Sequence, residues 1–115
     1  MIFISGKYGG LEENKEIAIE SAKWLYENFN EDAYVSGIWS LPHSYDELPY
    51  DDGLSNCIDL LEKCDSIIML MNFYESEGAL KELEYAKMRG KRIYLFDYMR
   101  YKLYLFKNNK LILYV

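Results

Sequence analysis

The stretch SIIMLMNFYESEGALKELEYAKMRGKRIYLF, residues 66–96, decides the fold class. Its beginning, residues 66–73, is a continuous apolar run of the kind shown by a strand that is covered on both faces. Ser76 then predicts the start of a helix and Gly90 its end. Residues 91–96 return to an apolar strand pattern. A strand, a helix and a strand in succession predict two parallel strands joined by a right-handed crossover.

The chain before this stretch has the same rhythm. Residues 1–5 predict a buried strand, and apolar positions at helical spacing predict a helix over 12–29. Residues 33–38 predict a second short strand. Residues 39–53 hold both prolines and show no period, so we expect a long loop, and long loops in compact domains are often functional. A further helix is expected from residue 54, with apolar residues at 54, 57, 58 and 61.

The tail, residues 98–115, allows two interpretations. One is a short helix, an Asn-Asn turn and a fifth strand; the other is a hairpin. The preceding alternation of strands and helices favours a fifth parallel strand. We therefore expect an α/β fold in which residues 1–115 form a single domain around a parallel sheet of about five strands.

Composition limits the possible partners. Thirteen Lys and Arg against nineteen Asp and Glu give a formal charge of −6, and 17% of the residues are aromatic, including twelve tyrosines. This is a globular composition, and it lacks the broad basic field that binding to nucleic-acid polymers needs. No apolar stretch reaches transmembrane length, so we expect no membrane partner. Cys57 and Cys64 have neither CxxC spacing nor a histidine nearby, which argues against a metal site or a disulfide; a reducing cytoplasm is the default location.

Ligands of open parallel sheets bind at the carboxyl ends of the strands, where the strand order reverses. Residues 6–11, 39–53 and 72–78 should meet at this edge. The segment GKYGG, residues 6–10, is either a tight turn or a loop whose backbone N–H groups and lysine hold an anion ahead of a helix beginning near Glu12. Taken alone, the loop favours the turn.

The helix expected over 76–90 carries the other candidates. Ser76 and Gly78 open it, where free N–H groups favour an anion, although an ordinary N-cap explains Ser76 equally well. Glu82 borders the apolar stripe of this helix, so it is either a nucleophile or base beside the crevice or a paired surface residue. Glu84 points away from the stripe and should be solvated. The stripe consists of Ala79, Leu83 and Ala86.

Three segments together resemble a known family. They are IFISG (2–6) with the glycines that follow, CDSIIML (64–70), and SEGALKELEYAKMRGK (76–91), which fits S-x-G-A-x-x-E-x-x-x-A-x-x-x-G. This pattern resembles the nucleoside 2-deoxyribosyltransferase-like superfamily, which includes the 2′-deoxynucleoside 5′-phosphate N-hydrolases and many small phage and bacterial proteins. The resemblance covers residue 1 to about residue 96.

The resemblance implies a flavodoxin-like (Rossmann-like) strand order 2-1-3-4-5, a dimer or larger assembly, no cofactor, and a small nucleotide or nucleoside as partner. The implied chemistry is cleavage or transfer at an N-glycosidic bond, in which a helix glutamate attacks C1′ and forms an ester that water or a second base resolves. Glu82 matches that nucleophile. The loops that hold a 5′-phosphate are matched by Gly6, Lys7, Gly9, Gly10, Ser76 and Gly78, with Tyr8 inside the first loop.

The base of the nucleotide is expected against residues 39–53, where aromatic rings can stack on it. The candidates are Trp39, Tyr45 and Tyr50, and of these Trp39 is included among the substrate-binding residues. His43 is left out of the catalytic set, because a lone loop histidine more often faces solvent.

Two positions depart from the family pattern. Phe3 stands where a tyrosine normally orients the glutamate, and Cys57 stands where an aspartate normally contacts the sugar and base. Asp59 lies on another side of the same helix, whereas Asp51 and Asp52 precede it and could reach the crevice. Two functions therefore remain open: an N-glycosidase or deoxyribosyltransferase, and a module that binds a nucleotide or nucleotide-derived signal without cleaving it.

Overall fold

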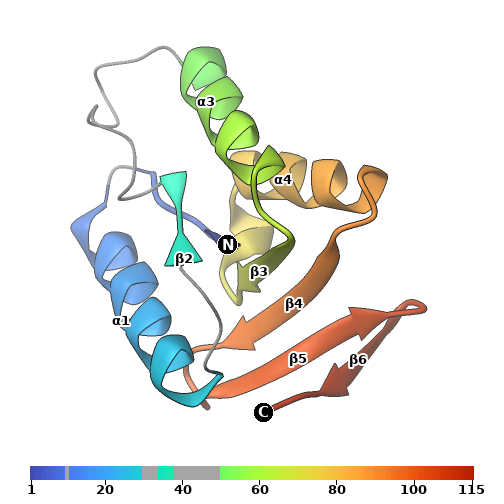
Figure 1. Cartoon of the computed structure of the whole chain (residues 1–115). Helices are drawn as coiled ribbons and strands as arrows, with labels where there is room; N and C mark the ends of the chain where they lie inside the picture. The colour runs from blue at the N-terminus through green and yellow to red at the C-terminus, as the bar shows by residue number, and fades with distance from the viewer. Residues whose placement is uncertain (10, 30–33, 38–49) are drawn as a thin grey trace.

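A mixed six-stranded sheet with helices on both faces organises the chain (Figure 1). The computed structural model describes residues 1–9, 11–29, 34–37 and 50–115. In chain order the elements are β1 (Ile2–Ser5), α1 (Glu12–Asn28), β2 (Tyr34–Val35), α3 (Tyr50–Glu62), β3 (Ser66–Leu70), the 3₁₀ turn η1 (Phe73–Glu75), α4 (Glu77–Met88), β4 (Arg92–Asp97), β5 (Lys102–Lys107) and β6 (Lys110–Leu113).

The first four strands are parallel and lie in the order β2-β1-β3-β4. Strand β1 pairs with β2 on one side and with β3 on the other, so the order reverses at β1. Every residue of β1 and β3 is buried, which is why both read as uninterrupted apolar runs. The predicted order 2-1-3-4 is confirmed, and it places the topological switch point between β1 and β3.

The expected fifth parallel strand is wrong. Strand β5 runs antiparallel to β4, and β6 runs antiparallel to β5, so the tail adopts the hairpin interpretation and the sheet has six strands. The physical reason is the length of the connection: only residues 98–101 separate β4 from β5, whereas a parallel crossover needs a dozen or more residues.

Both turns of the tail have a local cause. In the first turn, the Asp97 carboxylate accepts hydrogen bonds from the backbone N–H groups of Met99 (3.0 Å) and Arg100 (3.1 Å). In the second turn, Asn108 and Asn109 adopt φ values of 55° and 59°. Asparagine tolerates this left-handed conformation, and two such residues in succession suit a tight hairpin turn.

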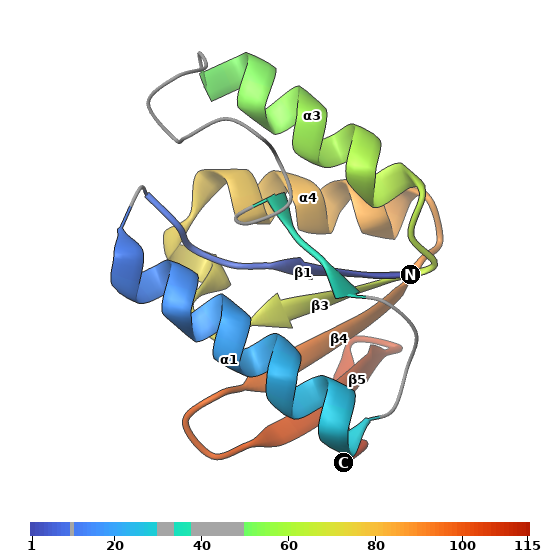
Figure 2. The same ribbon diagram turned by 60° about the vertical axis from the view of Figure 1, so that its left-hand side comes forward.

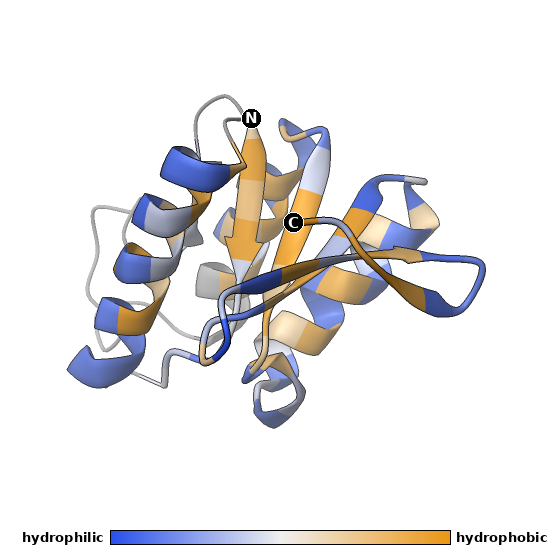
Figure 3. Cartoon of the chain, turned by 90° about the horizontal axis from the view of Figure 1, so that it is seen from below, coloured by the Kyte–Doolittle hydropathy of each residue, from blue (hydrophilic) through white to orange (hydrophobic). Residues whose placement is uncertain are grey.

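Two cores lie on opposite faces of the sheet, and Figure 2 shows the sheet between α1 on one side and α3 with α4 on the other. The first core joins α1 to the sheet through Ala18 and Leu25. The second joins α3 and α4 to the sheet through Leu61, Ala79 and Ala86. Figure 3 shows apolar strands in the middle of the fold beside helices whose outward faces are hydrophilic.

Aromatic rings fill much of the core beneath α1. Trp24 stacks on Phe96 at a centroid distance of 5.2 Å, and Phe29 meets the edges of Tyr94 and Tyr114 at 5.4 Å and 5.2 Å. Offset and edge-to-face arrangements of this kind stabilise a core beyond the area that they bury. A good part of the aromatic content therefore serves packing of the α1 face.

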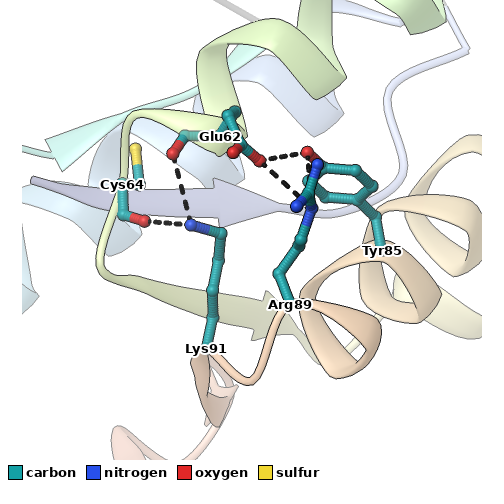
Figure 4. Close-up of polar contacts among 5 residues, drawn as sticks. All are labelled: Glu62, Cys64, Tyr85, Arg89 and Lys91. Atoms are coloured by element: carbon teal, nitrogen blue, oxygen red, sulfur yellow. Dashed lines mark hydrogen bonds and ion pairs between the residues drawn. The ribbon is translucent and has the colours of Figure 1, made fainter.

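A polar cluster joins the end of α3 to α4 and β4 (Figure 4). The Tyr85 hydroxyl donates to the Glu62 carboxylate, and Arg89 Nε lies 3.6 Å from the same carboxylate. Lys91 Nζ donates to the backbone carbonyls of Glu62 (3.3 Å) and Cys64 (2.6 Å). The hydrogen bond from Tyr85 lowers the pKa of Glu62, so the carboxylate stays charged. These contacts fix the position of α3 over α4.

The helix limits agree with the sequence patterns. The Ser76 hydroxyl accepts a hydrogen bond from Ala79 N (3.1 Å) at the start of α4, and Gly90, with φ of 67°, follows the helix end. The strand expected over 33–38 is shorter, comprising Tyr34 and Val35 in the described residues. Within the described part of the chain, no helix is long and apolar enough to span a bilayer.

Candidate active site

The loop that follows β1 packs against the end of β3. Lys7 N donates to Asn72 Oδ1 at 3.0 Å, and the Asn72 side chain is buried. A Cβ atom on Gly6 would lie 2.9 Å from Asn72 Oδ1 and 2.9 Å from Leu70 Cδ1, so only glycine permits this close approach. The two carboxyl ends expected to form the crevice are therefore in direct contact.

Glu82 lies at this edge of the sheet, inside the second core. It projects from α4 and is only 7% exposed. The hydroxyl of Ser5, the last residue of β1, donates to Glu82 Oε1 at 2.5 Å. Burial raises the pKa of Glu82 from 4.5 to about 7, while hydrogen bonds from Ser5 and Cys57 act in the opposite direction. Glu82 is thus a buried, hydrogen-bonded carboxyl group, not a surface residue.

Cys57 completes the surroundings of Glu82 from the α3 side. Its thiol lies close enough to the Glu82 carboxylate for each group to influence the pKa of the other. Burial, followed by the charge of Glu82 and a hydrogen bond to it, raises the pKa of Cys57 to about 12, so the thiol remains a donor at neutral pH. A Cβ atom on Gly37 would clash with Cys57 Sγ, so Gly37 leaves the space that the sulfur occupies.

The charge of Lys7 is already balanced in this structure. Its Nζ lies 3.3 Å from Glu75 Oε2, and both side chains are partly exposed. The carbonyl of Tyr8 accepts hydrogen bonds from Leu11 N (3.0 Å) and Asn14 Nδ2 (3.1 Å), which tie the loop to the start of α1. Gly9 adopts φ of 59° with open space around it. Within the described residues 6–9 the chain thus forms a turn in which the cation of Lys7 has an acidic partner.

At the start of α4, the Ser76 hydroxyl serves as the N-cap, which is one of the two roles expected of this residue. Gly78 is half-buried in the first turn, where backbone N–H groups have no acceptor within the helix. Acidic residues accompany both helix starts that flank the crevice, and each offsets part of the attraction for an anion. They are Glu12 and Glu13 in α1 and Glu77 in α4.

Several predicted residues lie elsewhere or outside the description. Phe3 is 1% exposed and belongs to the second core. Glu84 is exposed as expected, and Asp59 is exposed as well. The predictions for Gly10, Trp39, His43 and Tyr45, and for the side chains of Tyr50, Asp51 and Asp52, fall outside the described residues.

Sequence reasoning missed Ser5 and Asn72. Both are polar residues at or just beyond the carboxyl end of a buried apolar strand, and this position was the available signal. Among the residues that the structure describes, no group of three His, Cys, Asp or Glu side chains is arranged to hold a metal ion.

Comparisons with known proteins concern the family and the fold. A family model described as "Domain of unknown function (DUF4406)" matches residues 1–95. The chain belongs to the DUF4406 family. Its structure is similar to that of a 2-desoxiribosyltransferase from Leishmania mexicana, with a TM-score of 0.61 and 20% identity; the match covers 83% of this chain and 62% of that protein. No curated protein matches the sequence.

At 20% identity this likeness establishes the fold. The α/β arrangement of a deoxyribosyltransferase is therefore confirmed for this DUF4406 protein, and it spans less than two thirds of that relative's length. The family match ends inside β4, so the β5–β6 hairpin lies beyond it.

Proposed function

We propose that this DUF4406 protein is a single-domain nucleotide N-glycosidase or 2-deoxyribosyltransferase that uses Glu82 as its nucleophile. The observation that supports it is the Glu82 carboxyl group itself, buried at the topological switch point and hydrogen-bonded to Ser5. A buried carboxyl group whose pKa is moved to about 7 is a typical feature of catalytic sites. The deoxyribosyltransferase fold agrees with this assignment.

The reaction proceeds in two displacements. A carboxylate oxygen of Glu82 bonds to C1′ as the C1′–N bond breaks, and the base leaves with the bonding electrons and takes up a proton from solvent. Water, or a nitrogen of a second base, then attacks C1′, and the carboxylate leaves with the electrons of the ester bond. Only ionised Glu82 can attack, so the rate should rise with pH through about 7.

Base release is the direct test. Each 2′-deoxynucleoside 5′-monophosphate is incubated with the protein, and the free base is measured by chromatography. Glu82→Gln should abolish release while calorimetry shows that the nucleotide still binds. Glu84→Gln is the matched control, since Glu84 is exposed on the same helix, and it should leave release unchanged. Equal release by wild type and Glu82→Gln would remove Glu82 from the mechanism.

The substrate is proposed to be the 5′-phosphate form, held by Lys7 and the backbone of Gly6, Gly9 and Gly78, with Gly10 and Trp39 completing the site. Since Glu75 already pairs with Lys7, a phosphate must compete with that carboxylate. Lys7→Ala should weaken binding of the nucleotide but not of the nucleoside. Glu75→Gln should strengthen binding of the nucleotide. Equal affinities of nucleotide and nucleoside in wild type would contradict the phosphate assignment.

A nucleotide-binding module without catalysis is the second candidate. It is favoured by Phe3, which brings no hydroxyl to Glu82, and by Cys57, which brings a thiol in place of a carboxylate. In this case nucleotide binds, and no base is released by wild type.

We also propose a cytoplasmic homodimer or larger assembly. The free thiols of Cys57 and Cys64 suit a reducing compartment. Strand β6 is a sheet edge, and Leu111, Ile112 and Leu113 are each at least half exposed. In a two-fold dimer, the β6 strands of two copies can pair antiparallel along this edge. Light scattering should show an oligomer that Ile112→Lys disrupts; a wild-type monomer would contradict this.

A further inference from the structure

We propose that Ser5 and Cys57 are positioning residues that hold the Glu82 carboxylate from two sides for its attack on C1′. The inference rests on the proposed function and deepens it, because it names the groups that orient the nucleophile. Neither residue is offered as a group that touches substrate.

Three separate elements converge on the carboxylate. Ser5 ends β1, Cys57 lies on α3 and Glu82 lies on α4. Ser5 is 2% exposed and pairs with Met69 of β3, so its hydroxyl is held at the buried carboxyl end of β1. The hydrogen bond from this anchored donor restricts rotation of the carboxylate, and the Cys57 thiol approaches the same group from α3.

The position of Ser5 explains how the site accommodates Phe3. Residues two apart in a strand project to the same face, so Phe3 and Ser5 both face α3 and α4. Ser5 lies one step nearer the carboxyl end of β1, directly against Glu82. A hydroxyl on this face therefore reaches the carboxylate although Phe3 has none.

The two donors also control how much of Glu82 is ionised. Burial favours the protonated, unreactive acid, whereas hydrogen bonds from Ser5 and Cys57 favour the carboxylate. These are the described groups that act on its ionisation, one from β1 and one from α3. Removing either donor should leave less nucleophile at a given pH below neutrality.

The test begins with the ligand-free protein. Carbon-13 NMR of protein labelled at glutamate Cδ follows the ionisation of Glu82, and Glu82→Gln identifies its signal. The wild-type midpoint is expected near 7. Ser5→Ala and Cys57→Ala should each raise it by about one pH unit, the scale of a hydrogen bond to a charged group. Cys57→Ser keeps a donor and should stay close to wild type.

Matched controls separate this effect from general loss of a buried side chain. Ser66→Ala removes a buried serine from the neighbouring strand β3, and Cys64→Ala removes the buried cysteine just after α3. Both should leave the Glu82 midpoint unchanged. Thermal melting confirms that each variant is folded before its titration is compared.

Kinetics give the second readout. At about pH 6, below both midpoints, a rise of about one pH unit reduces the ionised fraction about tenfold. Ser5→Ala should therefore lower kcat for base release about tenfold at this pH with KM unchanged, and the loss should shrink above about pH 8. Cys57→Ser should restore the rate lost in Cys57→Ala.

Failure of this inference is distinguishable from failure of the proposed function. If the folded Ser5→Ala and Cys57→Ala variants titrate like wild type, Ser5 and Cys57 do not position the carboxylate, whether or not base is released. An unchanged kcat in an active Ser5→Ala protein overturns it equally. If the midpoints shift but wild type releases no base, the N-glycosidase assignment fails and the positioning role in that reaction fails with it.

Discussion

Replacement of Glu82 by glutamine should remove one contribution to the pH dependence of the protein's stability. The carboxyl group has a pKa of about 7 in the folded protein against 4.5 in the ordinary case, because burial outweighs the two hydrogen bonds that favour the charge. At about pH 5 to 7 the folded state keeps a proton that the unfolded state has released. The unfolded state therefore binds fewer protons, and stability falls as pH rises through this window.

The magnitude follows from the same values. The difference between 4.5 and about 7, at roughly 1.4 kcal/mol per pH unit, corresponds to about 3 kcal/mol of stability present below pH ~4.5 and lost above pH ~7. Glutamine carries no ionisable group but can still accept the Ser5 hydrogen bond. Glu82→Gln should therefore be less stable relative to wild type at low pH than at high pH. The difference in free energy of unfolding between the two proteins should change by about 3 kcal/mol over the whole range.

Urea denaturation of both proteins between about pH 4 and pH 9 measures this. Taking the difference between the two proteins cancels every other titrating group whose pKa the substitution leaves alone. Glu84→Gln, which neutralises an exposed carboxyl group on the same helix, should show a nearly flat difference. A flat difference for Glu82→Gln as well would refute the reasoning, because it would mean that Glu82 ionises normally in the fold.

Further predictions concern the loops and thiols. Gly6→Ala should destabilise the fold by about 1–3 kcal/mol, because its Cβ meets Asn72 and Leu70, whereas Gly9→Ala has room and should cost only about 1 kcal/mol from its positive φ; denaturation of both variants checks this. Asp97→Ala should destabilise the β4–β5 turn by about 1 kcal/mol and lower Tm, and Asp97→Asn should cost less because its amide oxygen can still accept backbone hydrogen bonds. Iodoacetamide at about pH 8 should modify Cys57 far more slowly in the native protein than in urea, since its pKa is about 12.

The parts of the fold that the sequence predicts are those with local causes. Ser76 and Gly90 delimit α4 because capping depends on the residues at the helix end, and buried parallel strands show as apolar runs. The direction of β5 has no such signal, since an apolar strand pattern is the same in parallel and antiparallel sheets. The short connection after Asp97 indicates an antiparallel strand, whereas the preceding alternation of strands and helices favours a parallel one.

The candidate site divides in the same way. Topology brings the ends of β1 and β3 together, so the meeting of Gly6 with the end of β3 follows from the strand order. The burial of Glu82 and its bond to Ser5 join residues 77 positions apart in the chain, and no local pattern reports such a contact. The pairing of Lys7 with Glu75 is of the same kind.

Cys57→Asp tests whether the family's aspartate can be restored. The thiol now donates to Glu82, so the substitution replaces a neutral donor by a second carboxyl group in contact with the first. Two such groups titrate as a pair: one proton is retained to higher pH, and full ionisation is opposed by like charge. The variant should be destabilised by about 2 kcal/mol or more at about pH 8 and recover towards pH 5, where the shared proton replaces the lost donor. Cys57→Asn, of equal size and without charge, should lack this pH dependence.

If the aspartate also protonates the departing base, release should rise about 10²-fold over wild type. Such a gain alongside the pH-dependent loss of stability would identify an enzyme impaired at this one position. The same loss of stability with no base released would instead favour the binding module, because the missing carboxylate would then not be what limits the chemistry.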